Sequence, residues 1–86
     1  MRVAVVTKDY TDYSRTVTEW LREMERQTGH TPELIDPDSR DGASFCRVYD
    51  IVQYPCVIAM SDDGQMQQMW PGVPLPTISE VSFYYA

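Results

Sequence analysis

In residues 49–64, YDIVQYPCVIAMSDDG, a proline leads into a short apolar run, and a turn follows it. The run Cys56-Val57-Ile58-Ala59-Met60 is typical of a strand that is covered on both faces of a sheet. The turn Ser61-Asp62-Asp63-Gly64 favours a hairpin, because Gly64 adopts positive φ angles without steric cost. We therefore expect a central strand that turns directly into an antiparallel neighbour.

The segments after this hairpin turn are shorter and more polar. Residues 65–70 alternate between polar and apolar, which predicts an antiparallel strand with one wetter face. Residues 71–76 are rich in proline and predict an extended linker. Residues 77–85 fit a two-turn helix capped by Thr77, but they also fit a strand, because Val, Phe and Tyr favour sheets.

The segments before the quoted stretch predict two strands and two helices. Residues 3–6 read as an interior strand, and residues 8–12 read as a loop. Apolar side chains at helical spacing predict an amphipathic helix over residues 13–28, started by Thr11 or Asp12 and ended by Gly29. Residues 33–36 predict an edge strand between two prolines, and a helix capped by Asp38 or Ser39 follows, running to about Tyr49 or Ile51.

These elements follow one another as β-α-β-α-β-β-α. We predict an α/β fold, with a four-stranded mixed sheet flanked by about three helices. A β-α-β start implies a parallel strand pair with a right-handed crossover. A chain of 86 residues is expected to form a single domain, residues 1–86.

Charge and cysteine content exclude several functional classes. Thirteen Asp and Glu stand against seven Lys and Arg, a net charge of −6, which disfavours nucleic acid and anionic membrane surfaces as partners. The two cysteines, Cys46 and Cys56, make no disulfide framework, so we expect reduced thiols in a cytoplasmic protein. Two Cys and one His at these separations match no zinc pattern, so no metal is expected.

The order of elements and the segment Tyr49-Asp50-Ile51-Val52-Gln53-Tyr54-Pro55 resemble the thioredoxin superfamily. In that family, a segment of the form Tyr-x-Ile-x-x-(apolar)-Pro precedes an apolar strand. The resemblance implies that the Tyr54–Pro55 peptide bond is cis. It also implies that the backbone edge beside Pro55 faces a bound peptide or glutathione.

The first loop, Thr7-Lys8-Asp9-Tyr10-Thr11-Asp12-Tyr13-Ser14, is similar to the glutaredoxin pattern of a strand, a Ser-Lys pair and Cys-Pro-Tyr-Cys. Thr11 and Ser14 stand where that pattern has its two cysteines. Thiol exchange requires a thiolate nucleophile, and a hydroxyl is essentially never ionised at neutral pH. The resemblance therefore implies a degenerate member that lacks the Cys-x-x-Cys motif and has no redox activity.

We accordingly expect a binding module that is not an enzyme. Its contact surface is the groove between the first loop and the proline segment, formed by Lys8, Tyr10, Thr11, Asp12, Tyr13, Ser14, Tyr54 and Pro55. Tyrosine side chains offer a large contact area with few rotors, and the net charge favours a neutral or basic protein or peptide.

No cofactor is expected, although glutathione binding stays open. Lys8 and Pro55 match two of the glutathione-binding elements of the family. Trp70-Pro71-Gly72-Val73 stands at the third element and lacks its acidic residue.

Two alternatives remain open. The first is a single-thiol glutaredoxin-like oxidoreductase that uses Cys56 as its catalytic residue. The second is a structural homodimer that associates through Met66, Met69, Trp70 and residues 83–85.

Overall fold

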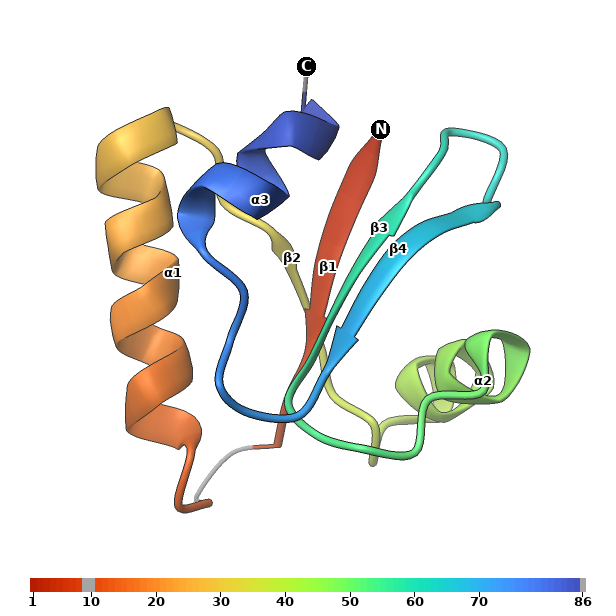
Figure 1. Ribbon diagram of the computed structural model, residues 1–86. Helices are drawn as coiled ribbons and strands as arrows, with labels where there is room; N and C mark the ends of the chain where they lie inside the picture. Colours follow the sequence, from red (N-terminus) through yellow and green to blue (C-terminus); the bar gives the residue numbers. More distant parts are fainter. Residues whose placement is uncertain (9–10, 86) are drawn as a thin grey trace.

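A computed structural model describes residues 1–8 and 11–85. Its sheet has the strand order β2-β1-β3-β4, in which β1 and β2 are parallel and the other neighbours are antiparallel (Figure 1). The predicted four-stranded mixed sheet with three helices is confirmed for the described residues. The elements are β1 (Arg2–Val6), α1 (Ser14–Thr28), β2 (Glu33–Ile35), α2 (Arg40–Tyr49), β3 (Cys56–Met60), β4 (Met66–Pro71), α3 (Ile78–Ser82) and a terminal 3₁₀ turn, η1 (Phe83–Tyr85).

The two central strands form the core. All five residues of β3 are buried, as predicted from the unbroken apolar run, and so are the last four residues of β1. Alternate side chains of a strand point to opposite faces, so these strands feed two separate core clusters. One cluster contains Val57 and packs against α1 and α3, whereas the other contains Ile58 and packs against α2.

Helix α1 confirms the predicted amphipathic helix but begins differently. Tyr13 occupies the N-cap position, and its side chain makes no capping hydrogen bond. The expectation that Thr11 or Asp12 caps the helix is therefore wrong. The Thr11 hydroxyl lies near the Lys8 carbonyl and the Ser14 hydroxyl instead. Gly29 ends the helix with φ 76°, as expected for a left-handed C-terminal position.

The other two helices begin at side-chain caps. The Ser39 hydroxyl accepts the Gly42 N–H at the start of α2, and the Thr77 hydroxyl accepts the Glu80 N–H at the start of α3. Residues 77–85, which also fitted a strand, are thus helical. The Trp20 indole N–H donates to the Pro76 carbonyl over 2.8 Å and attaches α3 to α1. Among the described residues, no helix has both the length and the apolar character needed to cross a bilayer.

Candidate functional site

Lys8 joins the two halves of the predicted groove. It follows the end of β1, and its carbonyl oxygen accepts hydrogen bonds from the Thr11 and Ser14 hydroxyls over 3.3 Å and 3.2 Å. Its ammonium lies 5.2 Å from the centroid of the Tyr54 ring and 3.7 Å from the Asp38 carboxylate. The start of α1 and the segment before Pro55 therefore meet through one residue.

The hydroxyls at Thr11 and Ser14 are bonded to their own loop. The Thr11 N–H donates to Ser14 Oγ over 2.9 Å, and the two hydroxyl oxygens lie 3.0 Å apart. The Tyr13 hydroxyl accepts the Lys8 N–H over 3.3 Å. These bonds connect Lys8 with residues 11–14. Asp12 is exposed beside them, and Tyr10 lies outside the described residues.

Tyr54 and Pro55 form the other wall. The bond between them is cis, Pro55 is fully buried, and its carbonyl accepts the Gly72 N–H over 2.8 Å. Burial raises the pKa of the Tyr54 hydroxyl, and Cys46 and Asp38 raise it further. The Tyr54 hydroxyl is therefore neutral at neutral pH. The ring that carries it lies beside the Lys8 ammonium.

Both thiols are core side chains. Cys56 has no exposed surface, and burial, followed by the nearby Cys46, raises the pKa of its thiol to about 11. Cys46 is 8% exposed and packs in the same cluster. Because the thiolate is the reactive form, this environment disfavours Cys56 as a nucleophile at neutral pH.

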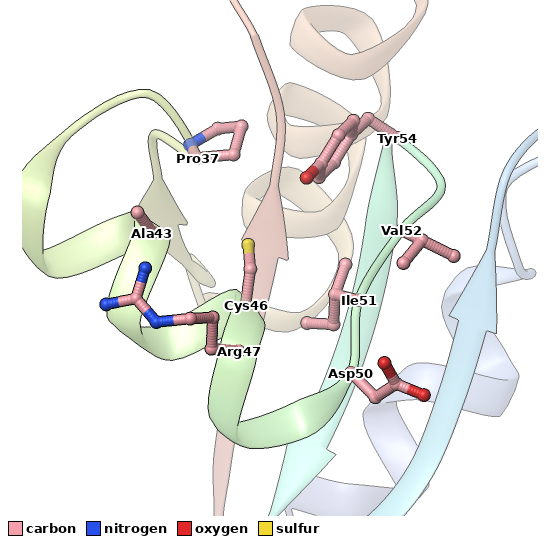
Figure 2. Close-up of a pocket in the computed structure, with 8 residues that line it drawn as sticks. All are labelled: Pro37, Ala43, Cys46, Arg47, Asp50, Ile51, Val52 and Tyr54. Carbon is pink, nitrogen blue, oxygen red and sulfur yellow. The ribbon is translucent and has the colours of Figure 1, made fainter.

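A pocket of about 290 Å³ opens between α2 and the segment before Pro55 (Figure 2). Of its lining residues, only Tyr54 was expected to be in the binding groove. The sequence pattern of α2 could have indicated other lining residues, because four of them recur at the spacing of one helix face: Ala43, Cys46, Arg47 and Asp50. The packing of that face against residues 51–54 is long-range and carries no local signal. The lining consists of Pro37, Ala43, Cys46, Arg47, Asp50, Ile51, Val52 and Tyr54.

The side chains assigned to the homodimer alternative differ in exposure. Met66 and Phe83 are exposed, at 49% and 74%. The others are partly buried against the two core clusters, since each packs on one face of the sheet; these are Met69, Trp70, Tyr84 and Tyr85.

No model of a protein family matches this chain, and no curated protein matches it. Among solved structures, thioredoxin 1 from the thermophilic eubacterium Thermosipho africanus matches with a TM-score of 0.67 and 15% sequence identity. The match covers 99% of this chain and 90% of that chain. At this identity the likeness concerns the backbone arrangement alone. Together with the sheet order and the position of Pro55 before β3, it shows that the chain has a thioredoxin-like fold.

Proposed function

We propose that this protein is a redox-inactive binding module that holds an extended segment of a protein or peptide partner beside Pro55. The observation that carries the proposal is the contact of Lys8 with both sides of the groove. Two hydroxyls bonded to the Lys8 carbonyl occupy the start of α1, and the Tyr54 ring lies beside the Lys8 ammonium. The site thus offers polar and aromatic contacts where thiol exchange would need a thiolate.

The backbone before Pro55 is available for strand addition. Among the backbone hydrogen bonds found between the described residues, none involves residues 52–54. The Val52 side chain is 78% exposed, and Gln53 is exposed too. An extended peptide gains affinity from main-chain hydrogen bonds to such a segment and specificity from side-chain pockets next to it.

The pocket between α2 and Tyr54 supplies such a specificity site. Pro37, Cys46 and Ile51 give it apolar walls, and Arg47 and Asp50 are its charged members (Figure 2). An apolar side chain of the partner fits these walls. We expect the partner residues around that side chain to be neutral or basic, because this chain has a net charge of −6.

A displayed random peptide library, selected on the 86-residue chain, tests the proposal. Selected peptides should bind the Tyr54→Ala variant at least about tenfold more weakly, because a tyrosine hot spot at the centre of an interface contributes about 2 kcal/mol or more and a tenfold loss corresponds to about 1.4 kcal/mol. Val48→Ala is the matched control, because Val48 is 75% exposed on α2 and does not line the pocket. Equal affinity for wild type and Tyr54→Ala would exclude this groove as the binding site.

Reduction of insulin disulfides by dithiothreitol tests the oxidoreductase alternative. We expect the protein to leave the reduction rate at the reagent background. Turnover that disappears in Cys56→Ala would support the single-thiol alternative and overturn the assignment as redox-inactive.

A further inference from the structure

Strand β4 has a free outer edge. It pairs only with β3 among the described strands and lies at one side of the sheet (Figure 1). Such an edge presents unpaired N–H and C=O groups to any strand that approaches it. Proteins usually protect these edges with charged side chains, prolines or bulges; β4 carries Pro71 and a bulge but no charged side chain.

The pairing register identifies the backbone groups that face outward. The Gly72 N–H donates to the Pro55 carbonyl, so Trp70 and Gln68, at two-residue intervals, also direct their backbone groups toward β3. Met69 between them faces away, and its N–H donates to the side-chain oxygen of Gln68 over 3.1 Å, a hydrogen bond that pairing with another strand would replace. Pro71 also faces away and offers only a carbonyl.

A bulge changes the spacing of these outward groups. Gln68 pairs with Ala59 and Met66 pairs with Met60, so Gln67 is one extra residue in β4. The Ser61 N–H donates to the Gln65 carbonyl, which leaves Met66 facing outward. The two outward amides, at Met66 and Met69, are therefore three residues apart, whereas a regular strand would place them two residues apart.

The three-residue spacing between the outward amides of Met66 and Met69 determines which strand can pair with this edge. A regular extended peptide can match the outward groups at Met66 or at Met69, but its own spacing does not match both. A second copy of β4 carries the same bulge and the same spacing. When two β4 strands lie antiparallel about a two-fold axis, Met66 of each copy lies opposite Met69 of the other. Each Met66–Met69 pair then exchanges two backbone hydrogen bonds.

The lack of charge along β4 also favours a second copy of this chain as the partner. No charged residue occurs from Gly64 to Ser79, in a chain whose net charge is −6. Two copies of this acidic chain therefore meet at this edge without placing like charges opposite each other. Pairing would also cover part of Met66, whose side chain is 49% exposed.

We propose that β4 is a self-association edge, through which two copies of this chain form an antiparallel dimer with a continuous eight-stranded sheet. The contact is small, because it consists mainly of one strand from each copy, and small interfaces are typical of weak, reversible association. The proposal does not rest on the proposed function, because the peptide site uses residues 52–54 and the pocket beside them.

Sedimentation equilibrium on the full chain, from micromolar to millimolar concentration, tests association. We expect a reversible monomer–dimer equilibrium that the Gln67→Lys variant weakens at least tenfold, because residue 67 of each copy lies next to the two-fold axis. Val48→Lys changes the net charge equally, at an exposed position of α2, and should leave the equilibrium unchanged. A monomer at all concentrations, or equal effects of the two variants, would overturn the proposal.

Amide hydrogen exchange tests the register. Protection of the Met66 and Met69 amides should rise with protein concentration, while the Gln68 and Trp70 amides, bonded to β3, stay protected throughout. A dimer that forms without added protection at Met66 and Met69 would place the interface elsewhere and contradict the proposed pairing.

Discussion

A single residue, Gly42, has to be glycine because its Cα lies close to a neighbouring backbone. A Cβ atom at this position would lie 1.7 Å from the Asp36 carbonyl oxygen. Helix propensity alone favours alanine over glycine by about 1 kcal/mol, whereas overpacking costs about 1–3 kcal/mol or more. We predict that Gly42→Ala lowers the free energy of unfolding by about 2 kcal/mol, measured by urea denaturation.

The control for this prediction is Ser44→Ala, an exposed position on the same helix. Its free energy of unfolding should stay within about 0.5 kcal/mol of wild type. Stabilisation by Gly42→Ala would mean that α2 does not press against the Asp36 carbonyl.

Burial of the Cys56 thiol makes stability depend on pH. Its pKa is raised from 9.0 to about 11 in the folded protein. Between pH 9 and 11 the folded state therefore retains a proton that the unfolded state loses, so the free energy of unfolding falls as pH rises. We predict that urea unfolding at pH 8, 9, 10 and 11 shows this fall more strongly in wild type than in Cys56→Ala.

The comparison with Cys56→Ala removes the contribution of other groups. The pKa values of Tyr54 and Tyr85 are also raised by burial, and these residues titrate in both proteins. Parallel curves for wild type and variant would show that the Cys56 thiol is not buried as the structure places it.

Among the helices, α3 depends on its N-cap residue, Thr77, which precedes Ile78. The Thr77 hydroxyl accepts the Glu80 N–H over 3.2 Å. The helix is short, and it holds the fully buried Val81 against the core cluster that also contains Val57. We predict that Thr77→Ala costs about 1 kcal/mol of unfolding free energy, the usual value of an N-cap, measured by thermal denaturation.

Thr18→Ala is the matched control for the N-cap. Thr18 lies inside α1 and is exposed, and its hydroxyl donates to the Ser14 carbonyl. Alanine has the higher helix propensity there, so this substitution should be neutral or slightly stabilising. If both substitutions lowered stability equally, the Thr77 cap would not explain the loss.

Elements with a strong local pattern were predictable from sequence. The unbroken apolar run predicted β3. The helical spacing of apolar residues, together with Gly29, predicted α1. Both signals are local, because each lies within one segment of the chain. β4 was displaced by one residue, and its bulge was not foreseen, since a bulge depends on how two strands pair. The pocket lined by Pro37 and Arg47 escaped prediction for the same reason: it forms where α2 meets the segment before Pro55.

In the molecule as a whole, the sheet separates two apolar core clusters, and the charged side chains lie at the surface. No charged side chain is buried among the described residues. The net charge of −6 therefore acts mainly through the solvent, where ions screen it. Two copies of the chain repel each other, whereas a basic partner is attracted.

These two effects give the two proposed interactions opposite dependence on salt. Raising NaCl from about 20 to 500 mM shortens the screening length from tens of ångströms to a few. Dimerisation through the uncharged β4 edge should strengthen, because screening removes the repulsion between two acidic copies. Binding of a basic peptide beside Tyr54 should weaken, mainly through a slower association rate.

Sedimentation equilibrium and stopped-flow fluorescence measure the two responses on one preparation. A neutral peptide of the same length is the control, and its association rate should change little with salt. Dimerisation that weakens with salt would mean that charged groups pair across the interface, which the β4 edge does not provide, since no charged residue occurs from Gly64 to Ser79.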